Sequence, residues 1–437
     1  MSSMTKDLFG ERAMSSFQVA AIATGVCLNM LDGFDILAMS FAASYVKGAF
    51  HLSSTQLGYL FSAGLMGMGV GSLVLGPVAD RRGRRPVVLF SVALAGLGML
   101  ASAATQGFAG MLVSRAVTGF GIGGAIACVA VVVAEFSSNR WRSAALAAFS
   151  TGYPIGATVG GVLTKYSIDR FGWQSAFVIG GVMTLLLLPV AWFRLPESLD
   201  FLLTRRPPGA LERANRLLGA MHAPPLADLG AAPATARDGS GPLGQLRRIL
   251  TGTTVLAWVM FFFTMAAFYF ILSWTPRLLT EAGLSAKQGL SGGVLLNLGG
   301  IIGCGGFALA AAVADARRLM IASLLGSAVL VALFGVVLRD LSVALGTALV
   351  LGIIANAAMS GLYAVGPQLY PTEVRATGMG WAIGMGRIGA ILAPTLTGTL
   401  MDSGWVPSQL YYLYGASFAI ATVAMLTIRR GASGAAT

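Results

Sequence analysis

Charged and metal-binding residues are scarce in this chain. Only 11% of its 437 residues are charged, and it contains three cysteines and two histidines. The cysteines, Cys27, Cys128 and Cys304, fall inside apolar stretches at unrelated spacings, which provides neither a disulfide framework nor the ligand set of a metal site. The sequence therefore implies no metal, nucleotide or organic cofactor.

Apolar residues predominate in the chain. They make up 56% of the chain and fall into blocks of about 20 residues, the length needed to cross a hydrocarbon core of roughly 30 Å. The sequence thus predicts an all-α polytopic membrane protein with twelve transmembrane helices. The first block is too long for a cleavable signal peptide, so we expect it to remain as the first helix. The predicted spans are residues 17–45, 54–78, 86–106, 108–134, 143–164, 173–194, 254–275, 289–313, 319–338, 342–365, 377–401 and 409–428.

The net charge of +12 is distributed unevenly between the predicted loops. Most lysines and arginines fall in segments that are cytoplasmic if the N-terminus lies inside, and this bias is the positive-inside signal of a membrane protein. We therefore expect both termini to be cytoplasmic in an inner-membrane protein, and the basic excess gives no evidence of a nucleic-acid partner. The residues expected to face outward are Lys47, Lys165, Arg170, Arg277, Lys287 and Arg339.

A polar segment, residues 196–253, separates six predicted spans from six. We interpret it as a mostly flexible cytoplasmic linker with one amphipathic surface helix around Ala210–Met221. Weak repetition relates the flanking halves, because Val78-Ala79-Asp80 after the second span recurs as Val313-Ala314-Asp315 after the eighth. Residues 1–195 and 254–437 are therefore predicted to form two pseudo-symmetric six-helix bundles with a site between them, as in many secondary transporters.

Glycines four residues apart recur along the predicted spans. Such small faces let helix backbones approach closely in lipid, so we interpret them as packing surfaces. The sets are Gly67/Gly71, Gly119/Gly123, Gly152/Gly156/Gly160, Gly299/Gly303 and Gly380/Gly384.

Two aspartates, Asp32 and Asp35, lie in the middle of the first span. A carboxylate at the centre of a bilayer-spanning helix costs roughly 2.5 to 3.5 kcal/mol on insertion scales, so a pair on one face indicates a function or a partner. The repeat places Ala267 and Phe268 at the corresponding positions, so the scaffold does not require these charges. Like charges in a dry cavity favour proton uptake by one carboxylate, and we expect this pair to exchange protons. A permanent salt bridge with no role in turnover is the alternative.

Arg115 is expected at the depth of the aspartates. Asp35 lies about 27 Å from the cytoplasmic start of its helix and Arg115 about 30 Å from Glu135 at the cytoplasmic end of the fourth span, at 1.5 Å per residue. We therefore expect Arg115 to pair with the aspartates and modulate them. Asn29, one turn before Asp32, is positioned to hydrogen-bond it.

Arg387 is the second cation inside the spans, and its counterpart in the first half is Pro154. Guanidinium binds carboxylate through a bidentate fork, so Arg387 is the first candidate to receive an anionic substrate, with Arg115 as the second. An internal structural ion pair is the alternative role for Arg387. Polar and aromatic residues that would line the pocket, unless they serve only in packing, are Asn29, Tyr153, Tyr269, Asn297, Tyr363 and Trp381.

A basic motif follows the second span and reads Gly76-Pro77-Val78-Ala79-Asp80-Arg81-Arg82-Gly83-Arg84-Arg85. It resembles the signature of the major facilitator superfamily, Gly-x-x-x-Asp-Arg-x-Gly-Arg-Arg/Lys. An aspartate at a helix end beside four arginines can pair with them and with a neighbouring helix N-terminus, which predicts a breakable cytoplasmic latch. A solvated topogenic face is the alternative. The residues assigned to the latch are Gly76, Asp80, Arg81, Gly83, Arg84, Arg85, Glu135, Arg142, Glu373 and Arg375.

Further segments resemble one branch of that superfamily, the aromatic acid:proton symporters. They are Asn29 to Asp35, Pro196-Glu197-Ser198, Tyr269 to Pro276, Tyr370 to Gly378 and Gly386 to Ala390. The segment Arg115 to Gly124 is similar to the second motif of the superfamily as a whole, whose arginine is associated with proton coupling. The resemblance implies a transporter rather than an enzyme, functional as a monomer, that imports a hydroxybenzoate- or benzoate-like anion with protons. Symport of an aliphatic organic acid, drug export, and a membrane receptor for aromatic acids are the alternatives.

Overall fold

The chain is helical in all the parts that the structure describes. The computed structural model describes residues 14–229, 250–338, 340–370 and 374–428, and no strand occurs among them. These residues divide into two compact units. Each unit is described by itself.

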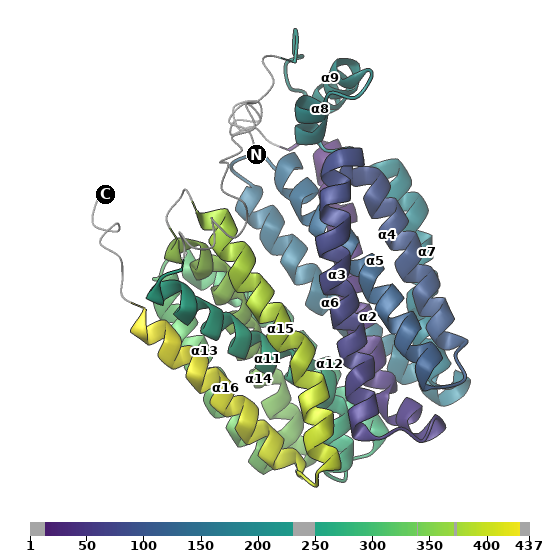
Figure 1. Cartoon of the computed structure of the whole chain (residues 1–437), viewed down its shortest axis with the longest axis vertical. Helices are drawn as coiled ribbons and strands as arrows, with labels where there is room; N and C mark the ends of the chain where they lie inside the picture. Colours follow the sequence, from purple (N-terminus) through teal and green to yellow (C-terminus); the bar gives the residue numbers. More distant parts are fainter. Residues whose placement is uncertain (1–13, 230–249, 339, 371–373, 429–437) are drawn as a thin grey trace. The chain divides into compact units, whose positions relative to one another are not determined.

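The first unit contains six long helices and two short ones, which are labelled in Figure 1. Among the long helices, α4 packs closely against both α5 and α7. The two short helices, α8 and α9, follow α7 along the chain. The helices are α2 (Ser16–Ala49), α3 (Ser54–Arg82), α4 (Arg84–Ala103), α5 (Phe108–Phe136), α6 (Arg142–Phe171), α7 (Gln174–Arg194), α8 (Leu199–Arg205) and α9 (Ala210–Ala220).

The second unit contains the remaining helices, together with the tip of the α2–α3 hairpin, Ala43–Ser62. Its closest helix pairs are α12 with α14, α11 with α15 and α13 with α16. The helices are α11 (Gly252–Glu281), α12 (Ala286–Ala311), α13 (Ala316–Val337), α14 (Leu341–Val365), η1 (Gly366–Leu369), α15 (Arg375–Asp402) and α16 (Pro407–Thr427).

The predicted architecture of membrane-length helices is confirmed. Eleven helices of the described chain are long and apolar enough to cross a membrane. The 28-residue helix α15 coincides with the remaining predicted span, residues 377–401. The all-α class with two helical bundles is therefore correct.

The predicted polar linker begins with ordered structure. Helix α9 confirms the amphipathic helix expected near Ala210, and its buried Ala214 and Leu218 join Leu199 and Leu202 of α8 in the core of the first unit. The boundaries 1–195, 196–253 and 254–437 stay a prediction. The compact units divide differently, because α8 and α9 group with the first unit and Ala43–Ser62 with the second.

Side chains at several helix starts satisfy backbone N–H groups that have no partner within the helix. Ser285 and Gln288 form a reciprocal capping box at α12. Asp315 accepts from the backbone nitrogen of Arg318 and so caps α13. The aspartate repeated in the second half thus has a helix-capping role.

Most of the predicted glycine faces are packing surfaces. A Cβ on Gly119 would lie 2.0 Å from the carbonyl oxygen of Gly64, and one on Gly156 would lie 1.8 Å from that of Met30. Backbone contact at these positions therefore excludes any side chain. The interpretation is wrong for Gly380 and Gly384 of α15, where a Cβ would meet no heavy atom within 4 Å.

Candidate functional site

Asp35 and Arg115 form a buried ion pair in the first unit. The Arg115 nitrogen Nη2 lies 2.6 Å from both carboxylate oxygens of Asp35, and the two side chains are 2% and 3% exposed. The guanidinium carbon also lies 5.5 Å from the centre of the Phe177 ring, a cation–π distance. The pairing of Arg115 with one of the aspartates, which we expected from helix depth, is confirmed.

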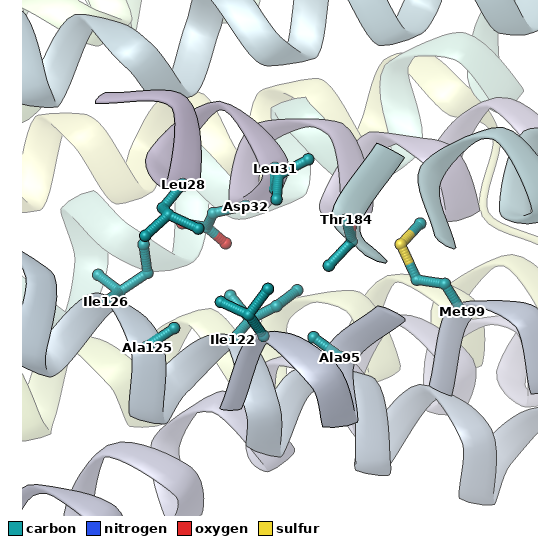
Figure 2. Close-up of a pocket in the computed structure, with 10 residues that line it drawn as sticks. Leu28, Leu31, Asp32, Ala95, Met99, Ile122, Ala125, Ile126 and Thr184 are labelled. Atoms are coloured by element: carbon teal, nitrogen blue, oxygen red, sulfur yellow. The ribbon is translucent and has the colours of Figure 1, made fainter. Parts of the chain in front are cut away.

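Asp32 lies one helical turn before Asp35 and faces a different environment. Its carboxyl borders a small pocket between α2, α4, α5 and α7, and Figure 2 shows the carboxyl oxygen directed among apolar side chains. The other residues that line the pocket are Leu28, Leu31, Val92, Ala95, Met99, Ile122, Ala125, Ile126 and Thr184.

Asn29 and Tyr153 position α2 against α6. The amide nitrogen of Asn29 donates to the carbonyl oxygen of Phe149 of α6 at 2.6 Å. A Cβ on Gly33 would lie 1.9 Å from the carbonyl oxygen of Tyr153. The helix that carries the aspartates is therefore held at backbone contact.

Arg387 lies among phenols in the second unit. Its Nη1 is 3.5 Å from the hydroxyl oxygen of Tyr269, and the Tyr363 phenol interacts electrostatically with both residues. Three helices, α11, α14 and α15, bring these groups together. A guanidinium beside two hydroxyl donors is suited to a carboxylate, because all three groups donate hydrogen bonds to oxygen.

Two of the predicted pocket residues, Tyr363 and Trp381, pack against aromatic rings. Tyr363 packs edge-on against Phe261 with ring centroids 6.4 Å apart, and Trp381 lies 6.0 Å from Trp258. Tyr363 and Trp381 are 42% and 38% exposed, whereas Tyr269 is 8% exposed. Asn297, the remaining predicted pocket residue, is 1% exposed and donates to the carbonyl oxygen of Gly293 in its own helix.

The turn between α3 and α4 is held by a buried ionic network in the first unit. Arg84 pairs with Glu135, whose side chain is 4% exposed, and also donates to the Ser198 hydroxyl at 3.1 Å. Glu197 accepts from the backbone nitrogen of Arg84 at 2.7 Å and so caps α4. Gly83 has a φ of +104°, and a Cβ there would lie 2.4 Å from Glu197, so glycine is required.

The other predicted latch residues lie at or near helix ends. The Asp80 side chain is 65% exposed and 3.8 Å from Arg84, while Arg81 is exposed. Arg85 donates to the carbonyl oxygen of Trp192 at 2.5 Å. A Cβ on Gly76 would meet open space. Arg142 and Arg375 are the first residues of α6 and α15, and Glu373 lies outside the described residues.

Glu197 and Ser198 received no role from the sequence. Both residues lie in a segment that resembles the symporters. The sequence signal that could have identified Ser198 is its position just before α8, which it caps by accepting a hydrogen bond from the backbone nitrogen of Phe201. Arg84 and Glu197 are 113 residues apart in the sequence, so local spacing gave no indication of their contact.

Ionisable side chains buried inside membrane-length helices mark solute and proton pathways, so the fold and the site define a secondary transporter rather than an enzyme. The chain belongs to the Major Facilitator Superfamily, whose family model matches residues 25–316.

Similar proteins support the same assignment. The chain is 32% identical to a gallate transporter of Pseudomonas putida over 96% of this chain and 94% of the relative. It is 33% identical to a 3-(3-hydroxy-phenyl)propionate transporter of Escherichia coli, over 89% of each chain. A crystal structure of a D-xylose-proton symporter shares the fold, with a TM-score of 0.76 at 16% identity over 94% of this chain and 98% of that one.

Proposed function

We propose that this protein is a symporter that imports an aromatic carboxylic acid, of the hydroxybenzoate or benzoate type, together with protons. The observation that carries the proposal is the cluster of Arg387, Tyr269 and Tyr363, which offers a cation and two phenols among aromatic rings. Relatives named for gallate and 3-(3-hydroxy-phenyl)propionate, aromatic acids that carry ring hydroxyls, support the same substrate class.

The proposal assigns complementary roles to the two sets of residues. Arg387 receives the carboxylate, while Tyr269, Tyr363 and Trp381 contact the ring. Asn29, Tyr153 and Asn297 complete the proposed pocket. Asp32 and Asp35 handle the protons under the influence of Arg115, because both are buried acids in the middle of an apolar helix.

The α3–α4 turn serves as a conformational latch in this proposal. Its buried Arg84–Glu135 pair supports that role, because an ionic network can break and reform as a transporter changes state. We further propose a monomer in the inner membrane, with lipid around it, no nucleic-acid partner, and both termini in the cytoplasm. The positive-inside bias of the loops supports this orientation.

Transport by the purified protein tests the proposal. Proteoliposomes are supplied with labelled gallate, 4-hydroxybenzoate, benzoate, succinate and a cationic drug, with the interior at higher pH than the medium. We expect saturable uptake of the aromatic acids above the rate in protein-free vesicles. Preferential uptake of succinate would indicate an aliphatic acid symporter. Drug extrusion would indicate an exporter, and binding of the acids without transport would indicate a receptor.

A further inference from the structure

An arginine and a tryptophan stack where α4 begins and α7 ends, two helices that pack side by side in the first unit (Figure 1). The guanidinium carbon of Arg85 lies 5.5 Å from the centre of the Trp192 ring, and the Arg85 Nη2 donates to the Trp192 carbonyl oxygen at 2.5 Å. Trp192 is 56% exposed, and Phe193 beside it is 81% exposed. Tryptophan is enriched at the level of the lipid headgroups in membrane proteins. The end of α7 therefore places the stacked guanidinium at that level.

The acids near this stack are engaged elsewhere. Glu135 and Asp80 both pair with Arg84, and Glu197 accepts hydrogen bonds from the backbone nitrogens of Arg84 and Arg85. Within the part of the chain that the structure describes, four arginines at this end of the unit form no ion pair. They are Arg81, Arg82, Arg85 and Arg194. This end of the unit therefore carries a surplus of positive charge.

Hydrogen-bonding capacity also remains on Arg85. Its Nε is buried and has no hydrogen-bond partner among the described residues, whereas buried donors in native proteins are nearly always paired. Arg194, the last residue of α7, is exposed two residues beyond Trp192 and adds a second guanidinium. Two guanidinium groups beside one aromatic ring are suited to a phosphate, because its oxygens accept paired N–H donors.

Apolar side chains extend from the stack along both helices. On α4, Phe90 and Leu97 lie seven residues apart on one face and are 54% and 57% exposed. On α7, Leu186 and Phe193 have the same spacing and are 65% and 81% exposed. In helices of membrane-spanning length such side chains face the lipid tails. A lipid whose tails lie along these side chains has its headgroup beside Arg85.

We propose that this α4–α7 face, made of Arg85, Arg194, Trp192, Phe90 and Leu186, binds an anionic phospholipid. The two arginines hold the phosphate, Trp192 lies between headgroup and tails, and the acyl chains lie along Phe90 and Leu186. A zwitterionic headgroup carries its own cation, which offsets the attraction to the arginines, whereas an anionic headgroup keeps its net charge. The face is therefore selective for phosphatidylglycerol over phosphatidylcholine. The site goes beyond the proposed transport function and does not depend on the substrate.

The bound lipid also affects the turn between α3 and α4. Arg85 directly follows Arg84, whose pair with Glu135 holds that turn. A ligand that binds only the folded protein raises its stability as the ligand concentration rises. Phosphatidylglycerol should therefore raise the melting temperature of the purified protein more than phosphatidylcholine does.

Native mass spectrometry of the whole chain in detergent measures the lipid preference. The protein is mixed with equal concentrations of phosphatidylglycerol and phosphatidylcholine that have matched acyl chains, and the abundances of the two single-lipid adducts are compared. We expect the phosphatidylglycerol adduct to predominate in wild type. One arginine near an anionic lipid accounts for about fivefold in affinity, so Arg85→Gln and Arg194→Gln should each lower the adduct ratio about fivefold. Arg85→Lys keeps the charge and should lower it less.

Arg216→Gln is the matched control, because Arg216 of α9 is exposed and pairs with Glu212 outside the α4–α7 face. It removes one arginine charge and should leave the adduct ratio unchanged. Melting temperatures verify that each variant is folded, and the exposed Arg194 still tests the site if Arg85→Gln unfolds the protein.

Four outcomes would overturn the proposal. A wild-type adduct ratio near one would show that the protein does not select anionic lipid. An unchanged ratio in Arg194→Gln and in the folded Arg85 variants would place the lipid elsewhere, and an equal fall in Arg216→Gln would make the effect one of general surface charge. Displacement of phosphatidylglycerol by inorganic phosphate at equal concentration would show that the site binds free phosphate rather than a lipid.

Discussion

The carboxylate of Asp402, the last residue of α15, accepts the backbone N–H of Ser54, the first residue of α3, at 2.9 Å. Its second oxygen accepts the N–H of Thr55 at 2.8 Å. An anion at a helix N-terminus also interacts favourably with the helix dipole. Close packing accompanies this cap, because a Cβ on Gly398 would lie 2.2 Å from the carbonyl oxygen of Ser54. The C-terminus of one helix thus holds the start of another within the second unit.

Removal of this cap should loosen the tip of the α2–α3 hairpin, Ala43–Ser62. Loss of an N-cap costs about 1 kcal/mol, so Asp402→Ala should raise local opening about fivefold. Hydrogen exchange of the amides at the start of α3, measured in detergent or nanodiscs, reports this opening. Asp340→Ala, which removes the corresponding cap from α14, is the control and should leave these amides unchanged. Equal protection in both variants would show that packing alone holds the tip.

The Asp402 cap should be insensitive to pH near neutrality. Partial burial raises the pKa of Asp402, but hydrogen bonds from Thr55, Ser54 and Ser53 outweigh this effect and hold the pKa below its usual range. A carboxyl group whose pKa is lowered on docking contributes its full stabilisation above the undocked pKa, and loses it as pH falls through the lowered value. Exchange at the start of α3, corrected for intrinsic rates, should therefore be constant from about pH 6 to about pH 8.

The Asp35–Arg115 pair should dominate the stability of the first unit's core. Leaving one charge of a buried pair without its partner costs roughly 3 to 5 kcal/mol, so Asp35→Asn and Arg115→Gln should each lower the melting temperature strongly. The double variant removes both charges and should cost much less than the sum of the single variants. Thermal unfolding of the four proteins forms a double-mutant cycle. Additive effects would mean that the two side chains do not stabilise each other.

Substitutions of Glu135 and Asp80 should differ sharply in their cost to stability, although both side chains pair with Arg84. The Glu135 side chain is 4% exposed and that of Asp80 is 65% exposed. Glu135→Gln should therefore cost roughly 3 to 5 kcal/mol of stability, whereas Asp80→Asn should cost at most about 1 kcal/mol. If Asp80 is part of the latch, Asp80→Asn should still slow turnover at nearly unchanged stability. Equal stabilities of the two variants would contradict the assignment of the buried network to Glu135.

The open glycines of α15 allow a test of the proposed substrate site at Arg387. Gly380, Gly384 and Arg387 lie on one helix face, and an added Cβ at Gly384 meets no heavy atom within 4 Å. Gly384→Ala should raise stability by up to about 1 kcal/mol, since alanine favours a helix over glycine. Uptake should nevertheless fall, more steeply for Gly384→Leu, because the new side chain occupies space beside Arg387. Gly346→Ala, at an equally open glycine of α14, is the control for uptake.

Helix depth predicted contacts well where two charges had to meet. Asp35 and Arg115 lie in different helices, yet counting 1.5 Å per residue placed them at one level, and a buried charge requires a partner. Counting charges and helix depth gave no partner for Glu197. Its carboxylate accepts hydrogen bonds from backbone N–H groups, which the start of any helix can provide. Local spacing likewise did not predict that the Asn29 amide donates to the carbonyl oxygen of Phe149 on another helix.

Glycine spacing shows the same limit. Gly119/Gly123 and Gly380/Gly384 have identical spacing, but only the first pair meets a neighbouring backbone. Spacing defines a smooth helix face, and the approach of a second helix is decided by residues elsewhere in the chain. The fold followed from length and hydrophobicity, which act along each helix. The pocket depends on which faces remain uncovered, and the sequence of one helix does not contain that information.

Arg387 should prove to be the carboxylate receptor, because its guanidinium lies 3.5 Å from the hydroxyl of Tyr269 and interacts electrostatically with the phenol of Tyr363, and a guanidinium binds a carboxylate through a bidentate fork. Truncating one partner of a desolvated charge pair costs roughly 2 to 5 kcal/mol, so Arg387→Ala should weaken binding of 4-hydroxybenzoate by that amount. Lysine should restore binding only in part, since it lacks the planar fork. The uncharged analogue 4-hydroxybenzamide should lose little affinity on mutation, because it never uses the charge. Calorimetric titration of both ligands into wild type, Arg387→Ala and Arg387→Lys measures the difference. Equal losses for acid and amide would make Arg387 a structural residue, and the anion site would then have to be sought first at Arg115.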